Sequence, residues 1–163
     1  MKDISTTQTR DNIAAVMQRL ADMPSALARF RAVVPDERLR EPLGPGERSL
    51  TEQMAHLVNV DALASGSIYL ALLLNTPPFP PIHAERDLGK LLRHDLMPFD
   101  DLLAYFTFRR QVLLQVLAGL SDAQWSRTIR EEGKARQESV YWRARGLAHH
   151  EQSHLTDLAG KLG

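Results

Sequence analysis

The sequence predicts an all-α fold, a four-helix bundle formed by a single domain over residues 1–163, and three observations support this. The nine prolines fall into two groups, residues 24–45 and 77–98, and none follows Pro98. Because proline interrupts helix interiors and sheet ladders, these groups mark connections. The long segments between them repeat apolar residues at helical spacing. Period-2 runs of Val, Ile or Thr are absent, so no strand is predicted.

The first two helices precede the second proline group. Residues 9–34 are expected to form the first helix, with an apolar stripe and the option of a bend at Pro24. The second helix begins at Ser49 and ends before Pro77. A capping box marks its start, since the Ser49 hydroxyl and the Glu52 carboxylate can each satisfy a free backbone amide.

The third and fourth helices follow the second proline group. The third begins near Pro98, a suitable first-turn residue, and continues to residue 120 with leucines three and four positions apart. Residues 121–124 begin a short helical turn, and the polar residues 127–137 are predicted as a loop. The fourth helix begins near Ser139 and ends near Gly160 or Gly163.

The connection between the second and third helices, residues 76–97, is too long for a tight turn between antiparallel neighbours. We expect it to cross the bundle and to carry a short helix around residues 84–92.

Charge and composition exclude several classes of partner. The chain has 20 Lys and Arg against 20 Asp and Glu, and a pI of about 7.0. A broad surface for nucleic acid or an anionic membrane is therefore not expected. The longest apolar run, residues 68–74, is too short to span a bilayer.

The absence of cysteine narrows the chemistry. No disulfide, thiolate ligand or cysteine nucleophile can form, so a transition-metal site must use His, Asp or Glu. The polar N-terminus shows no secretory signal, and the expected location is the cytoplasm.

Three of the six histidines form a candidate metal site. His150 and His154 lie four residues apart on the fourth helix, so both imidazoles face one side and can hold one ion. His56 lies on the apolar stripe of the second helix and is the candidate third ligand. Three neutral imidazoles leave a divalent cation with open positions, which suits catalysis. Zn or Ni is the expected metal.

The run from His150 to His154 also matches the H-E-x-x-H signature of metalloproteases, with Glu151 as the base. We discount this function because zincins usually take a third ligand well downstream.

Three motifs in order resemble the DinB-like (YfiT-type) superfamily. Residues 49–57 (SLTEQMAHL) resemble its helix-2 motif, and residues 149–155 (HHEQSHL) resemble its helix-4 motif. Residues 108–125 are similar to its third helix and the turn that follows. Arg48 stands where members often have Trp, and Asp157 stands where many have Gln.

The resemblance implies an up-down-down-up bundle in which residues 76–97 are the crossover. It also implies a metal site from His56, His150 and His154 completed by water, and a homodimer. Characterised relatives include transferases and isomerases that use low-molecular-weight thiols, and others are proposed metal-dependent hydrolases.

Two functions remain open from the sequence. The first is a metal-dependent enzyme acting on a small molecule, either a hydrolase or a transferase that uses a low-molecular-weight thiol. The second is a non-catalytic dimeric metal-binding or stress-response bundle.

Several charged residues have two interpretations. Arg110 lies on the apolar stripe of the third helix, so it is either ion-paired or an anchor for a substrate carboxylate. Glu151 lies about 100° from the ligand face, so it is exposed or supports a ligand, with a role as catalytic base as the weaker alternative.

The remaining polar residues of interest are expected to be solvated. His149 is assigned to the rim, and His83 and His94 to the loop. Arg143 and Arg145 are expected on a solvated face of the fourth helix.

Overall fold

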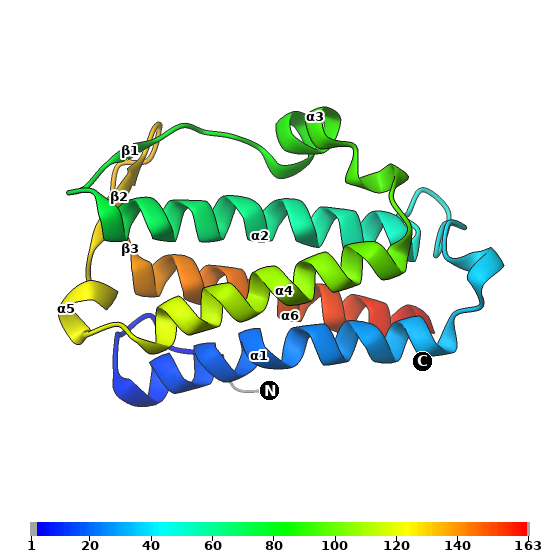
Figure 1. Cartoon of the computed structure of the whole chain (residues 1–163), viewed down its shortest axis with the longest axis horizontal. Coiled ribbons are helices and arrows are strands. Elements are labelled where there is room, and N and C mark those ends of the chain that lie inside the picture. The colour runs from blue at the N-terminus through cyan, green and yellow to red at the C-terminus, as the bar shows by residue number, and fades with distance from the viewer. Residues whose placement is uncertain (1–2, 163) are drawn as a thin grey trace.

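The computed structural model describes residues 3–162 as a bundle of four long helices with a small sheet at one end (Figure 1). The long helices are α1 (Arg10–Val33), α2 (Leu50–Leu73), α4 (Phe99–Ala118) and α6 (Val140–Leu162). Helices α1 and α2 each pack against both α4 and α6. The chain colour in Figure 1 shows that α1 and α6 run one way and α2 and α4 the other. This confirms the all-α, up-down-down-up bundle.

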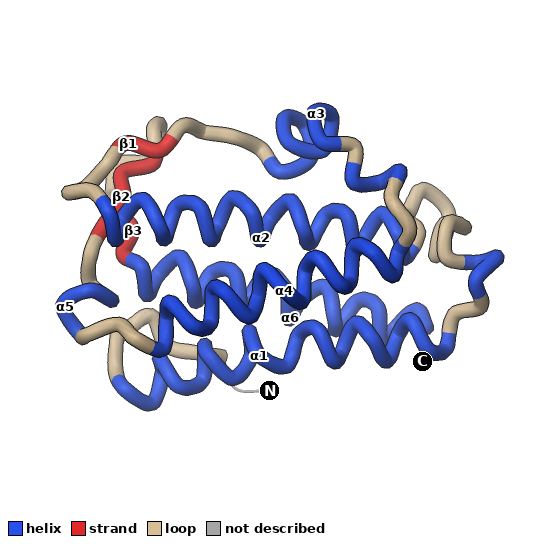
Figure 2. The backbone as a smooth tube through the Cα atoms, viewed as in Figure 1, coloured by secondary structure: helices blue, strands red, loops and turns tan. Residues whose placement is uncertain are grey.

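The long connection from α2 to α4 crosses the molecule along α2, as Figure 2 shows. Its helical elements are the π-helix η2 (Ala84–Gly89), α3 (Lys90–Leu92) and the 3-10 helix η3 (His94–Leu96). The predicted short helix over residues 84–92 is therefore confirmed. Arg40, before α2, donates hydrogen bonds to three consecutive carbonyls at the end of this crossover, those of Asp95, Leu96 and Met97.

The prediction that the chain has no strand was wrong. A three-stranded sheet of order β1-β2-β3 combines β1 (Pro78–Phe79), β2 (Thr128–Glu131) and β3 (Glu138–Ser139). Strand β1 is parallel to β2, and β2 is antiparallel to β3. The predicted loop over residues 127–137 thus contains β2. Strands of two to four residues are too short to show alternation in the sequence, which is why they were missed.

The remaining short elements are the 3-10 helix η1 (Asp36–Arg38) and helix α5 (Asp122–Trp125). By length and composition α2 is the one helix of the described chain that could cross a membrane, but half of its most apolar stretch is buried inside the bundle. Its apolarity is that of a core helix packed against α4 and α6.

A layer of charged residues divides the core into two apolar clusters. Its centre is Arg110 on α4, which is 1% exposed. The Arg110 guanidinium donates to the Leu20 carbonyl of α1 at 2.9 Å, to Asp61 of α2 at 3.0 Å and to Glu151 of α6 at 2.8 Å. Arg109 also donates to Asp61, at 2.8 Å. We call Asp61, Arg109, Arg110 and Glu151 the Arg110 cluster.

The contacts of this cluster distinguish between the interpretations given above for Arg110 and for Glu151. Arg110 is ion-paired within the core, and its burial keeps it away from any substrate in this conformation. Glu151 is 2% exposed, so of the alternatives given for it the exposed position was wrong. Burial raises the pKa of Glu151, and the pairing with Arg110 opposes this rise. The Glu151 side chain points away from the ligand face of α6, as predicted, but toward the interior of the bundle and not toward solvent.

Candidate metal centre

The structure brings His56, His150 and His154 together, and we call them the three-histidine cluster. The capping box begins α2 at Ser49, as the sequence predicts, and places His56 two turns into the helix. His150 and His154 project from successive turns of α6 toward it. The His150 Nε2 atom lies 3.0 Å from His56 Nε2 and 3.1 Å from His154 Nε2. One nitrogen from each residue lies within 4.8 Å of the others.

These positions fit a divalent cation. Two imidazole nitrogens bound to one Zn²⁺ at about 2.0–2.1 Å in a tetrahedral shell are separated by about 3.4 Å. The distances from His150 Nε2 to His56 Nε2 and to His154 Nε2 are a few tenths of an ångström shorter than this, and small side-chain rotations can supply the difference. The three donors are all neutral imidazoles, the ligand type that suits Zn and Ni.

Glu85 of η2 orients the first of these ligands. Its Oε1 atom lies 2.6 Å from His56 Nδ1. The hydrogen bond from Nδ1 to this carboxylate places the proton on Nδ1 and leaves the lone pair of His56 Nε2 facing the other two histidines. Arg48 lies 3.6 Å from the same carboxylate and helps to hold it. The crossover thus supplies part of the site.

Electrostatics keep the three imidazoles neutral. Burial lowers the pKa of His56, although the hydrogen bond with Glu85 opposes this. Burial also lowers the pKa of His150, with His56 and Arg48 adding to the effect. Burial and the neighbouring His150 lower the pKa of His154 to about 4. A neutral imidazole is the form that binds a metal, so these three side chains can take up a cation at neutral pH without first losing a proton.

The other histidines have separate roles. His149 lies at the rim, as expected, with its Nε2 atom 3.0 Å from Asp3. His83 caps η2 by accepting from two of its backbone amides. His94 lies 2.8 Å from the Asn59 side chain and so ties η3 to α2. His83 is exposed, as expected, although its ring also caps η2, whereas His94 is half-buried against α2 rather than fully solvated.

Sequence reasoning missed Glu85 and Arg48. Glu85 lies 29 residues from His56, and its contact depends on the path of an irregular connection. No motif relates the two residues. The one usable signal was that the crossover is long enough to return over α2.

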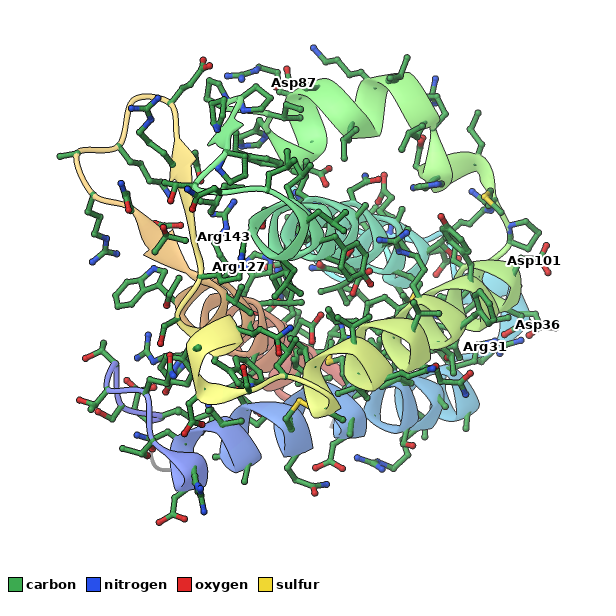
Figure 3. The ribbon with its side chains drawn as sticks, turned by 60° about the vertical axis from the view of Figure 1, so that its left-hand side comes forward. Arg31, Asp36, Asp87, Asp101, Arg127 and Arg143 are labelled. Atoms are coloured by element: carbon green, nitrogen blue, oxygen red, sulfur yellow. The ribbon has the colours of Figure 1, made fainter. Side chains whose placement is uncertain are left out.

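An open cavity of about 380 Å³ lies beside the three-histidine cluster, with His150 on its wall. Arg143 also lines this cavity. Figure 3 shows Arg143 beside the small sheet. The prediction that Arg143 lies on a solvated face was wrong, because its side chain is 16% exposed and pairs with Glu131 and Glu138. Arg145 donates to the Ile4 carbonyl. The geometry therefore combines three convergent imidazoles with space for a small molecule.

Comparison with solved structures places this fold among known bundles. YfiT from Bacillus subtilis, described as "a probable metal-dependent hydrolase with an unusual four-helix bundle topology", superposes with a TM-score of 0.81 at 18% identity. The match covers 99% of this chain and 94% of that one. A mycothiol-dependent maleylpyruvate isomerase superposes with a TM-score of 0.68 at 14% identity, covering 100% of this chain and 68% of that one. At such identities the likeness establishes the fold alone.

No curated protein sequence matches the chain. A family model, however, matches residues 6–158, which is nearly the whole length and includes α1, the crossover and all three histidines of the cluster. The chain belongs to the DinB superfamily.

Proposed function

We propose that the protein is a metal-dependent enzyme that binds one divalent cation, Zn or Ni, at His56, His150 and His154. We further propose that it acts on a small molecule, as a hydrolase or as a transferase that uses a low-molecular-weight thiol. The convergence of the three Nε2 atoms carries the proposal. The two solved neighbours, one described as "a probable metal-dependent hydrolase" and one as a mycothiol-dependent isomerase, support the two reaction classes.

The chain's own residues would position and shield the reaction. When bound, a divalent cation supplies Lewis acidity that activates a water or a thiol as a nucleophile at neutral pH. Glu85 holds the proton on His56 Nδ1 and so keeps Nε2 available. The crossover covers the cluster from the α2 side, and the cavity beside His150 gives a substrate access. Because the chain has no cysteine, a thiol nucleophile has to be a co-substrate.

The test of this function combines elemental analysis with two activity screens. We expect about one Zn or Ni per purified chain, and metal-dependent turnover either of esters and amides in water or of electrophiles supplied with a low-molecular-weight thiol. Loss of turnover on chelation and its return with the metal would support the enzyme. Stoichiometric metal without turnover in either screen would favour the non-catalytic bundle instead.

The Glu85→Gln variant isolates the contribution of the crossover to metal affinity. Glutamine keeps the shape of the side chain but removes the charge that fixes His56. We expect the metal affinity to fall roughly 10- to 100-fold, the usual effect of losing a carboxylate behind a histidine ligand. A competition titration with a chelator measures this change.

The matched control is Arg86→Gln, on the neighbouring residue of η2, whose side chain pairs with Asp87 and with no histidine of the described chain. Its metal affinity should equal that of the wild type. Equal affinities for the wild type and Glu85→Gln would mean that the carboxylate does not orient His56.

The proposal includes a single-domain homodimer in the cytoplasm. Family resemblance supports the dimer, and sedimentation of the purified protein measures it directly.

A further inference from the structure

Helices α2 and α4 lie side by side, and their outward sides carry almost no charge. Residues 62–84 contain no Asp, Glu, Lys or Arg, and residues 102–121 contain only Arg109 and Arg110, although a quarter of the chain is charged. Figure 1 shows α4 nearest the viewer with α2 beside it, and no other described element in front of their central turns. We call this outward side the α2–α4 face, formed by Gly66, Tyr69, Leu73, Tyr105, Phe108 and Val112.

Large apolar side chains are exposed on the α2–α4 face at helical spacing. Tyr105, Phe108 and Val112 recur at intervals of three and four residues, so they form one row along α4. Phe108 is 64% exposed, and Leu73 of α2 is 78% exposed. Gly66 leaves open space beside them, because a Cβ there would meet no heavy atom of the described chain within 4 Å. A continuous apolar patch of this kind marks an interaction surface.

The one partly exposed cation at this face is paired within the chain. Arg109 Nε lies 2.8 Å from Asp61, and its Nη2 atom donates to Ser65 Oγ at 2.8 Å. The Tyr105 ring covers part of the guanidinium, with 5.6 Å between Arg109 Cζ and the ring centroid. Arg110 is buried in the core. The α2–α4 face therefore presents an apolar surface with a paired charge at its edge.

A face without free charge is what association of two identical copies requires. Around a two-fold axis each residue meets the same residue of the other copy, so an unpaired charge near the axis would face a like charge. The opposite side of the bundle, formed by α1 and α6, does not meet this condition. It exposes Asp22, Arg29 and Asp157. Depletion of charge together with exposed Tyr and Phe is also typical of interface centres.

The α2–α4 face is large enough for a stable dimer. Helix α4 has 20 residues and is about 30 Å long. With α2 beside it, the face is about 20 Å wide, which gives a flat footprint of about 600 Å². Because side chains add relief, the accessible area approaches the roughly 800 Å² that each partner buries in a standard interface.

We infer that a second copy of this chain covers the α2–α4 face, in a homodimer whose two-fold axis passes near Phe108. This residue lies midway along α4, with Tyr105 and Val112 one turn to either side. The inference rests on the homodimer proposed above and adds its interface to it. The cavity beside His150 stays open in this dimer, because it lies between α2, α6 and the crossover.

Sedimentation velocity of Phe108→Glu tests the interface. We expect the wild type to sediment as a dimer and the variant as a monomer. The axis would bring two carboxylates together in an apolar surface, so the dissociation constant of the dimer should rise at least about 100-fold. Helix content by circular dichroism and metal content should match the wild type, because Phe108 is exposed in the protomer and outside the three-histidine cluster.

The matched control is Val33→Glu, at the end of α1. Val33 is 65% exposed, nearly the same as Phe108, and lies outside the α2–α4 face. This variant should dimerise like the wild type. A dimer that persists in Phe108→Glu, or one that dissociates in Val33→Glu, would overturn the assigned interface.

A mixing experiment tests the position of the axis. Phe108→Glu and Phe108→Lys should each be monomeric alone, and an equimolar mixture should form a heterodimer. Glutamate and lysine can meet only if position 108 of one copy lies close to position 108 of the other. A mixture that stays monomeric would exclude an axis at Phe108.

The interface and the homodimer can fail separately. A wild-type dimer that survives in Phe108→Glu would refute the interface and leave the homodimer in place, whereas a monomeric wild type would refute both. A lipid surface is the rival occupant, since α2 is long and apolar enough to suggest one. Binding of a monomeric wild type to phosphatidylcholine vesicles, lost in Phe108→Glu, would assign the face to lipid and overturn the inference.

Discussion

The His154→Ala variant is expected to lose its divalent cation during purification. Removing one of three ligands leaves two imidazoles, and the affinity should fall by more than the roughly 10- to 100-fold that accompanies loss of a supporting carboxylate. Metal content measured by elemental analysis should drop from about one ion per chain to a small fraction. Because the side chain is half-buried at the bundle surface, the helices themselves should remain folded, which circular dichroism checks.

The control is His149→Ala, which removes the neighbouring imidazole on α6. Its Nε2 atom faces Asp3, away from the three-histidine cluster, so metal content should equal that of the wild type. Unchanged stoichiometry in His154→Ala would refute the ligand set, and metal loss in His149→Ala would mean that the wrong face of α6 was assigned.

The Arg110→Met variant should be the most destabilising single substitution in the charged layer. Methionine fills a similar volume but leaves Glu151 buried without its cation and the Leu20 carbonyl without its donor. Breaking one side of a buried ion pair typically costs about 3–5 kcal/mol. Urea denaturation should show a loss of this size in the free energy of unfolding, with no change in slope.

The exposed pair of Arg38 and Glu41 provides the comparison. Its side chains are 65% and 59% exposed, and Arg38→Met should change stability by no more than about 1 kcal/mol. The double variant Arg110→Met/Glu151→Leu should recover part of the lost stability, because it removes the buried cation together with one of its two carboxylates, while Asp61 keeps its pair with Arg109. Equal effects of Arg38→Met and Arg110→Met would contradict the assigned importance of the layer.

The large features of this fold could be predicted because they rest on local patterns. Helix α2 is specified by the capping box at Ser49 and by its apolar content, and the i,i+4 pair of His150 and His154 depends only on helix geometry. The crossover follows from proline spacing and chain length. His56 could be chosen as the third ligand because it lies on the apolar stripe of a neighbouring helix, the side expected to face the core of the bundle.

The missed features depend on contacts between distant segments. Strand β1 meets β2 only after the chain has crossed the end of the bundle, and neither has enough residues to show a period. The helical position of Glu151, turned away from the ligand face, was predicted correctly, but its burial was not. The sequence does not reveal that Glu151 contacts Arg110 of α4, which lies 41 residues away. Glu85 escaped notice for the same reason.

The Arg110 cluster restricts which parts of the bundle can move relative to one another. A rotation of α6 about its axis would separate Glu151 from Arg110. Because His150 and His154 lie on the same helix, it would also move them out of contact with His56. The crossover, in contrast, is fastened near the histidines by a few polar contacts, chiefly those of Glu85 and His94. Any transient opening that admits a ligand to this centre should therefore come from lifting the crossover, while the four long helices stay still.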